Sequence, residues 1–378
     1  MNLMSLDKYR QEFPVVKNCT YLNHAACGTL PSRARKAVQA YISDFNEFAA
    51  SNYSNWTTTI EATRSMAARL INAKPEEIAF VKNTTEGLCF AANGIKWEVG
   101  DNIILNDLEF PSNLYPWMNL SQQGVETRVV KSVNGRISID AINSMIDCRT
   151  RAISISHVEY GNGFRNDIAT LGSLCRENNI CFVVDAIQSL GQIPVDVEKM
   201  GIDILTADGH KWLLSAEGTG IFYCAPHVME KLRLYEVGWN SVTDAGNYDS
   251  CDPTPASTAR RFECGSYNTI GIYAMGASLE LLLEVGIEAI QSRLQTLTNL
   301  LVAELSNSGY QILSPRGESE WSGIVTFGSN IYDTEDLHQK LRQKQIIGAK
   351  RCGGIRISPH FYNTEEEVLR VIEAIPNH

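Results

Sequence analysis

A lysine and an aspartate each follow an apolar stretch of the sequence. Lys211 comes shortly after the segment Asp203–Asp208, and Asp185 ends the apolar run that begins at Cys181. If both stretches are β-strands, the two side chains lie at the carboxyl ends of strands, where open α/β sheets bind ligands. A lysine there can form an imine with an aldehyde cofactor, and a buried carboxylate can keep a pyridine nitrogen protonated. The pair predicts an enzyme that uses pyridoxal phosphate.

Other polar residues are placed to hold the ends of such a cofactor. Gln188 follows Asp185 by one helical turn and can reach a phenolic oxygen. Thr84 and Thr85 lie between a predicted strand and a predicted helix, where free backbone N–H groups bind anions. Taken alone, the threonines are better explained as a helix N-cap. His210 taken alone fits a phosphate donor and a hydrogen-bonded histidine at a strand end about equally well. Together with the lysine, they favour a phosphate-binding site.

An arginine near the carboxyl end supplies a partner for a substrate. Arg356 lies in the short segment Gly353–Ser358, which we expect to contain a β-strand of a smaller unit. A guanidinium group pairs bidentately with a carboxylate, as binding of an α-amino acid requires. The alternative is a surface salt bridge. The neighbouring glycines allow a ligand to approach closely, which favours the ligand-binding interpretation.

Short apolar runs alternate with helical patterns over the first two thirds of the chain. The runs near 78–81, 102–105, 127–130, 152–155 and 182–184 have the length and composition of strands. Helical patterns cover about 31–50, 58–72, the region after 85, and 168–178. This alternation indicates a largely parallel sheet with helices on both faces. A polar stretch at 238–258 predicts a long loop, and Thr364–Glu367 predicts a capping box that starts the last helix.

Composition excludes several classes of function. A chain of 378 residues is expected to form two domains, and its net charge of −10 argues against nucleic-acid and anionic membrane partners. No apolar stretch approaches a membrane span, and the first ten residues are too polar for a secretory signal. The ten cysteines form no C-x-x-C pair, which disfavours a structural zinc and a disulfide framework. We expect a cytoplasmic protein with reduced thiols and no metal.

These residues together resemble the class V aminotransferase family of fold-type I pyridoxal-phosphate enzymes. That family includes cysteine desulfurases, cysteine and cystine C–S lyases and isopenicillin N epimerase-like proteins. The resemblance extends from Tyr21–Gly28 to Tyr362–Glu366. It implies an α/β fold with a mostly parallel seven-stranded sheet sandwiched by helices, in a large cofactor-binding domain at 15–275. It also implies a small α+β domain formed by 276–378 together with 1–14.

The resemblance also implies a role for each matched residue. Lys211 would carry the cofactor and move the α-proton of the substrate, Asp185 would pair with the pyridinium nitrogen, and Phe110 would stack on the ring. The remaining implied roles are phosphate binding by Thr84, Thr85 and His210, a hydrogen bond from Gln188 to the phenolic oxygen, carboxylate binding by Arg356, and an entrance lined by Asn23, His24 and Tyr160. The segment Arg261–Ser266 resembles the family's R-F-E-x-G-T. Ser266 would therefore reach the phosphate of the partner subunit in a homodimer with shared sites.

Several departures from the family pattern bear on the reaction. Phe110 stands where desulfurases have a histidine, and it can stack but cannot transfer a proton. Desulfurases carry a nucleophilic cysteine on a mobile loop, but Ile346–Gly354 is too short for that loop, so Cys352 is expected to be structural. Tyr160 replaces the usual asparagine. Asp208 replaces a phosphate-binding serine or threonine, and its carboxylate is expected to point away from the phosphate.

The sequence therefore favours β-elimination at a C–S bond of an α-amino acid, which needs a single base. Transamination is the alternative, and it needs Lys211 to return a proton to the cofactor. Epimerisation needs a second base, which Phe110 cannot supply, and the short segment before Arg356 argues against desulfurase chemistry. The alternative from another class is a non-catalytic protein that binds pyridoxal phosphate as a carrier or scaffold.

Overall fold

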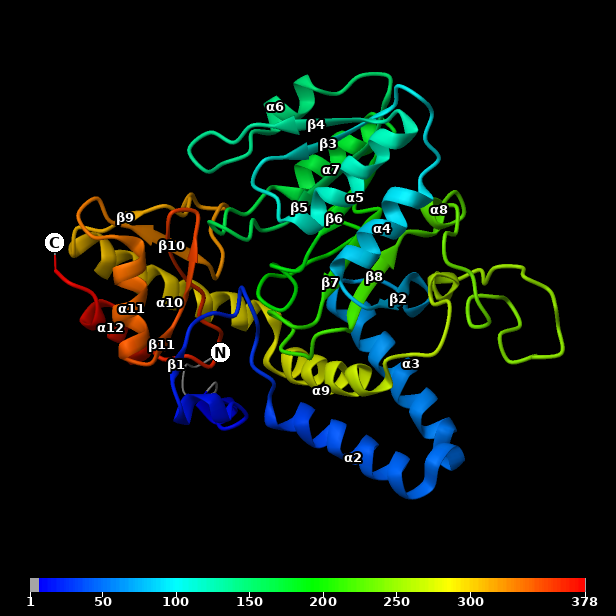
Figure 1. Ribbon diagram of the computed structural model, residues 1–378, viewed down its shortest axis with the longest axis horizontal. Coiled ribbons are helices and arrows are strands. Elements are labelled where there is room, and N and C mark those ends of the chain that lie inside the picture. The colour runs from blue at the N-terminus through cyan, green and yellow to red at the C-terminus, as the bar shows by residue number, and fades with distance from the viewer. Residues whose placement is uncertain (1–6, 378) are drawn as a thin grey trace.

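The central feature of the fold is a seven-stranded sheet, seen in a computed structural model that describes residues 7–377 (Figure 1). Its strand order is β2-β8-β7-β6-β5-β3-β4, and β8 pairs antiparallel with both β2 and β7, whereas the other neighbouring strands pair in parallel. The strands are β2 (Ile78–Val81), β3 (Asn102–Asn106), β4 (Glu126–Val130), β5 (Thr150–Ser156), β6 (Cys181–Asp185), β7 (Ile204–Asp208) and β8 (Gly220–Cys224). The predicted mostly parallel seven-stranded sheet is confirmed.

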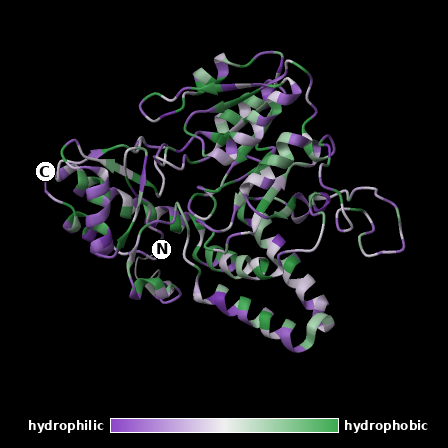
Figure 2. Cartoon of the chain, viewed as in Figure 1, coloured by the Kyte–Doolittle hydropathy of each residue, from purple (hydrophilic) through white to green (hydrophobic). Residues whose placement is uncertain are grey.

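Helices cover both faces of this sheet, which explains why its inner strands are apolar throughout. Neighbouring residues of one strand pack into two different cores: Val183 joins the core beneath α4, α5 and α8, and Val184 joins the core beneath α3, α7 and α9. The helices of this part are α2 (Ser32–Phe48), α3 (Tyr53–Leu70), α4 (Thr84–Gly94), α5 (Tyr115–Met118), α6 (Ile139–Ser144), α7 (Ile168–Glu177), α8 (Pro226–Met229) and α9 (Thr269–Val285). Hydrophobic colouring is concentrated in the sheet, whereas the outlying α2 alternates between polar and apolar residues (Figure 2).

A smaller α+β unit follows and has a third core of its own. It contains a four-stranded antiparallel sheet in the order β12-β13-β10-β9, and its last helix starts with the expected capping box between Thr364 and Glu367. Its elements are α10 (Ile287–Asn307), β9 (Gln311–Ile312), β10 (Val325–Gly328), α11 (Thr334–Gln343), β11 (Ile346–Ile347), β12 (Ala349–Arg351), β13 (Gly354–Ile357) and α12 (Glu365–Ala374). The predicted division at 275/276 falls inside α9 and stays a prediction.

The amino-terminal part of the chain connects the two units. After α1 (Asp7–Arg10), strand β1 (Thr20–Tyr21) pairs in parallel with β11, and Leu22 packs in the core of the smaller unit. The following residues return to the large sheet, where the backbone N–H of Gly28 donates to the carbonyl oxygen of His210. A side chain at Gly28 would overlap the carbonyl oxygen of Lys211, so this close approach requires glycine.

The polar segment 238–258 contains no helix or strand among the described residues, as expected, and it extends away from the body of the molecule (Figure 1). No single helix within residues 7–377 has the length and composition to cross a membrane. The pair α9 and α10 passes that test only when joined across a bend of 77°.

A buried ion pair connects the edge of the sheet to the segment that contains Ser266. Arg64 donates to both carboxylate oxygens of Glu263, at 2.7 and 3.1 Å, and both side chains are buried. Glu263 also accepts from the backbone N–H of Phe80 at 2.7 Å and from the hydroxyl of Tyr267 at 2.7 Å. This carboxylate therefore fixes β2, which leads directly to the start of α4.

We expect Glu263→Gln to lower the free energy of unfolding by about 3–5 kcal/mol, because Arg64 would remain buried without its counter-charge. Urea unfolding followed by far-UV circular dichroism measures this change. Glu61→Gln is the matched control, because Glu61 meets the same arginine from the solvent side and is about half exposed; its expected effect is below about 1 kcal/mol. Equal effects of the two variants would contradict the assignment.

Candidate active site

Lys211 lies just beyond the carboxyl end of β7 and is almost fully buried, with 8% of its surface exposed. Its Nζ makes no hydrogen bond or ion pair with any residue of the described chain, and it lies 5.6 Å from the centre of the Phe110 ring. Burial lowers the pKa of this amine to about 8, although the negative charge of Asp185 opposes the shift. The neutral, nucleophilic form of the amine is therefore far more populated near neutral pH than in an ordinary lysine.

Asp185 ends β6, the strand that pairs in parallel with β7. Its Oδ1 accepts from the backbone N–H of Ile187 at 2.9 Å, which fixes the carboxylate at the strand end. Burial raises its pKa to about 6, while that hydrogen bond and the charge of Lys211 act in the opposite direction. The acid and the amine therefore face one cavity without pairing directly, and both are available to a ligand.

The start of α4 forms one end of this cavity. Asn83 caps the helix by accepting from the N–H of Glu86, and the hydroxyl of Thr85 donates to Ser112 at 2.8 Å. The hydroxyl oxygen of Thr84 accepts from the backbone N–H of Asp208 at 3.0 Å. The first N–H groups of a helix have no partner within the helix and attract anions.

The sequence predicts that the carboxylate of Asp208 points away from this end of the cavity, but in the structure it does not. It lines the cavity, and its Oδ2 lies 2.9 Å from Nδ1 of His210, although the contact lacks hydrogen-bond geometry. The imidazole of His210 therefore lies directly beside the Asp208 carboxylate at this end of the cavity.

Arg356 forms the opposite end of the cavity from strand β13. Its Nη1 donates to the backbone oxygen of Tyr160 at 2.6 Å, its Nη2 lies 3.5 Å from Oδ1 of Asn23, and its Nε has no partner. Burial lowers the pKa of this guanidinium to about 10, and the nearby Arg351 adds to that shift. The Phe110 and Tyr160 rings meet edge to face at 5.1 Å beside it. This end suits a carboxylate with an apolar wall.

Gln188 is held in place by its neighbours. Its Nε2 donates to the carbonyl oxygen of Ala25 at 2.9 Å, and its Oε1 accepts from the indole of Trp212 at 2.8 Å. The second N–H of the amide remains for a ligand. The predicted contact with a phenolic oxygen is therefore compatible with the geometry and stays a prediction.

One cavity of about 220 Å³ brings together most of the residues predicted from the sequence. Those that line it are Thr84, Thr85, Phe110, Tyr160, Asp185, Gln188, His210, Lys211 and Arg356. Sequence reasoning missed Ser112 and Arg351, which also line it. Ser112 belongs to the segment already singled out for Phe110, which is a usable signal, whereas Arg351 enters only because β12 pairs with β13.

The prediction that His24 lines the entrance is wrong. Its ring is fully buried, with Nδ1 2.9 Å from the carbonyl oxygen of Ser358 and Nε2 2.8 Å from the hydroxyl of Tyr362. Burial lowers its pKa to about 4, so the ring is neutral and structural. In the extended segment around the Asn23–Ser358 bridge, successive side chains point to opposite sides, and only Asn23 faces the arginine.

The predicted site residues Asn23 and Ser266 do not line the cavity either, and Cys352 lies outside it. Ser266 is exposed and belongs to a separate hollow near Glu263 and Gly265, so it does not meet Lys211 within one chain. Cys352 occupies a two-residue turn between β12 and β13, where it and Gly353 both have positive φ angles of 50° and 74°. Burial raises the pKa of its thiol. These features agree with the expectation of a structural cysteine on a short, rigid turn.

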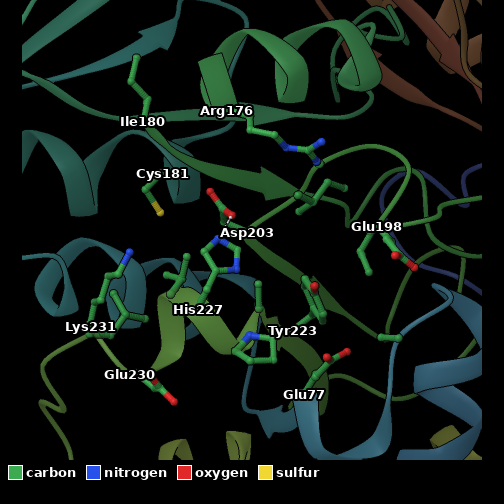
Figure 3. A pocket seen from close by; sticks show the side chains of 18 of the residues that line it. Glu77, Arg176, Ile180, Cys181, Glu198, Asp203, Tyr223, His227, Glu230 and Lys231 are labelled. Atoms are coloured by element: carbon green, nitrogen blue, oxygen red, sulfur yellow. Dashed lines mark ion pairs between the residues drawn. The ribbon is translucent and has the colours of Figure 1, made fainter. Parts of the chain in front are cut away.

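A larger cavity of about 1140 Å³ lies at the other end of the inner strands, where β6 and β7 begin (Figure 3). There His227 pairs with Asp203 at 3.0 Å, and Arg176, Cys181 and Lys231 surround them. None of the predicted site residues lines it. The smaller cavity is the candidate active site because it holds the unpaired buried amine, the acid and the arginine.

The residues of the smaller cavity fit pyridoxal phosphate. A helix start with hydroxyl and imidazole groups suits the phosphate, Lys211 suits the aldehyde, and Asp185 suits a pyridine nitrogen. Arg356 retains an unpartnered Nε for the carboxylate of a substrate. Among the residues that line the cavity, the buried atoms without a partner are Oδ1 of Asp208, Nδ1 of His210 and Nε of Arg356, at the two ends where the phosphate and a substrate carboxylate would bind.

Comparisons with known proteins agree with this site. The Aminotransferase class-V family model matches residues 20–371. A probable cysteine desulfurase of Methanothermobacter thermautotrophicus is 29% identical over 99% of this chain and 98% of its own length. An uncharacterized aminotransferase of Bacillus subtilis is 28% identical over 98% and 97%. The solved structure of a cystine C–S lyase, C-DES, in complex with cysteine persulfide has the same fold, with a TM-score of 0.87 and 24% identity over 96% of this chain and 98% of that one.

The ionisation of Lys211 predicts how the apoenzyme takes up its cofactor. Only the neutral amine adds to an aldehyde, so the rate of incorporation should rise with pH and level off above about 8. Asp185→Asn removes the charge that raises the pKa of Lys211, and the rise should shift to lower pH. Stopped-flow absorbance of the apoenzyme mixed with pyridoxal phosphate measures both curves. A rate independent of pH, or a shift of the variant to higher pH, would contradict this assignment.

Proposed function

The chain belongs to the class V aminotransferase family, and we propose that this pyridoxal-phosphate enzyme removes a sulfur substituent from a cysteine-like α-amino acid by β-elimination. The observation that carries the proposal is a single buried base, Lys211, between an acid and an arginine, with an aromatic ring where a second base would stand. Elimination requires one base, and the cavity supplies one.

The side chains divide the work of the reaction among them. Arg356, helped by Arg351, binds the α-carboxylate and turns the Cα–H bond toward Lys211. Pyridoxal phosphate, when bound, supplies an electron sink for the charge that develops at Cα. Asp185 keeps the pyridine nitrogen protonated, and Lys211 takes the α-proton as a neutral amine. The β-substituent leaves as a thiolate, and hydrolysis of the remaining three-carbon unit gives pyruvate and ammonia.

The relatives are named as desulfurase, aminotransferase and lyase, so their names alone do not identify the reaction. The residues of the cavity distinguish these three reactions. Persulfide transfer by a desulfurase uses a cysteine on a mobile loop, whereas Cys352 lies in a two-residue turn and packs against Gly161. Transamination is the second candidate, because Lys211 is placed to return a proton and the Bacillus subtilis relative is named an aminotransferase. Epimerisation lacks a second base beside Phe110.

The product distinguishes these reactions. We expect the purified protein to be yellow, to lose that colour with borohydride, and to release pyruvate from cystine or cysteine conjugates. Lys211→Ala should abolish both the bleaching and the pyruvate. Regeneration of the original spectrum only after a keto acid is added would establish transamination instead. A colourless protein that takes up no cofactor would contradict the proposal and favour a role outside catalysis.

We also propose that the protein is a homodimer in which each subunit contributes Ser266 to the active site of the other. Gly265, next to the exposed Ser266, lies beside the indole of Trp239, which is exposed together with Tyr235 and Val237 of the same segment. Contiguous exposed apolar side chains of this kind are typical of protein interfaces. Asn83 and Thr85 line both the cofactor cavity and a neighbouring hollow that contains Tyr235. A second subunit seated on this surface can therefore place its serine at the phosphate end.

Mixing two defective variants tests the shared site. Lys211→Ala removes the base, and Ser266→Glu places a negative charge against the phosphate of the partner subunit. Hybrid dimers contain one site with both native residues, so refolding an equal mixture should restore about a quarter of the wild-type activity. Each variant refolded alone is the control. If Ser266 acts within its own subunit or has no role at the phosphate, mixing will restore nothing beyond the two controls.

A further inference from the structure

Two buried glutamates lie behind the cavity and take no direct part in the proposed reaction. Glu109 and Glu159 are fully enclosed near the carboxyl ends of β3 and β5. Each directly precedes an aromatic residue of the cavity wall, Phe110 and Tyr160 respectively. The two carboxyl groups are connected through one side chain, because Nδ2 of Asn106 lies 2.7 Å from one and 3.2 Å from the other.

Glu109 is surrounded by donors. Its Oε1 accepts from the backbone N–H of Ser156 at 2.7 Å as well as from Asn106, and its Oε2 accepts from the hydroxyl of Ser156 at 2.6 Å. Both of its oxygens are therefore used as acceptors, which is the pattern that an ionised carboxylate requires.

Glu159 has a different environment. Its Oε1 accepts from Asn106 and from Nδ2 of Asn166, the latter at 2.9 Å, but its Oε2 is buried and has no hydrogen-bond partner. An ionised oxygen in that position would be unsatisfied, whereas a protonated one carries no charge. Burial, with the negative charge of Glu109 adding to it, raises the pKa of Glu159 far above its ordinary value. Burial also raises the pKa of Glu109 to about 7.

Glu109 and Glu159 are linked to residues that would bind the cofactor and the substrate. Ser156 pairs with Asp185 across β5 and β6, and the residue after Glu159 supplies the carbonyl oxygen that holds Arg356. A displacement of Glu159 would therefore move both the aromatic wall and the guanidinium. We propose that Glu109 and Glu159 are positioning residues: a carboxyl pair that retains a proton on Glu159 and thereby fixes Phe110, Tyr160 and Arg356 around the substrate. This inference rests on the proposed function, because the substrate is the molecule so positioned.

Replacing glutamate by glutamine should change KM little at position 159 and strongly at position 109. In Glu159→Gln the amide oxygen can replace Oε1 and the NH₂ group can replace the unpartnered, protonated Oε2, so KM should stay within about twofold of wild type. In Glu109→Gln an NH₂ group replaces the Oε2 acceptor, so the hydroxyl of Ser156 loses its acceptor and has to turn. KM should therefore rise about tenfold or more, with a smaller change in kcat. If Glu109→Gln does not fold, Ser156→Ala replaces it, with an expected KM increase of about threefold to tenfold.

A pH profile separates positioning from general stability. At alkaline pH wild type should lose the proton of Glu159, which places a second charge beside Glu109 and Asp185, and KM should rise. Glu159→Gln cannot ionise, so this increase should be absent. Asp185, Tyr160 and Cys352 are the other titratable groups that act on the pair, and all three are unchanged in the variant. An alkaline increase that persists in Glu159→Gln, or equal KM values for the two glutamine variants, would overturn the proposal.

Thermal unfolding gives a readout that does not depend on the reaction. A carboxyl group whose pKa is raised in the folded state binds protons that the unfolded chain releases, so stability falls as the pH rises from the ordinary glutamate range through about 7. Glu159→Gln should make this fall shallower. If it does so while wild type neither binds pyridoxal phosphate nor releases pyruvate, the proposed function fails and the protonation of the pair stands. If wild type is active and the variant shows no difference in either profile, only this inference fails.

Discussion

The site depends on burying an amine and a carboxylate close together without letting them pair. A direct contact between Lys211 and Asp185 would satisfy both groups and leave neither for a ligand. The parallel sheet prevents this, because β6 and β7 end side by side and each charge is attached beyond its own strand. Burial then acts on both in the same sense: it lowers the pKa of the amine and raises that of the acid. The pair is thus poised near neutral pH before any cofactor arrives.

Such an arrangement destabilises the fold locally and has to be supported from elsewhere. The support comes from networks of buried hydrogen bonds around the site. The Arg64–Glu263 pair fixes the edge strand that leads to α4, and Asp185 itself is held by the backbone N–H of Ile187. Asn106 and Ser156 hold the glutamates behind the aromatic wall. Lys211, whose amine has no partner among the described residues, thus lies inside a frame of hydrogen-bonded groups.

Sequence reasoning recovered the parts of this structure that depend on local order. Strand ends follow from apolar runs, so Lys211 and Asp185 could be placed at one edge of the sheet, and Arg356 on its short strand. It failed where a contact is set by pairing between distant segments. His24 looked like an entrance residue, yet the bridge between Asn23 and Ser358 turns it into the interior. The position of Arg351 at the cavity depends on the pairing of β12 with β13, and the contact of Glu109 and Glu159 through Asn106 depends on tertiary structure. The spacing of these residues in the sequence indicates neither.

The position of the amino-terminal segment has a consequence for how the protein is made. Thr20 pairs with Ile346, and Gly28 lies against His210, so β1 and the residues after it are held by two segments that are synthesised much later. The contact with Ile346 cannot form until the ribosome has made the chain as far as that residue. The wall of the cavity that Arg356 supplies is therefore completed long after the strands that carry Asp185 and Lys211 have been made.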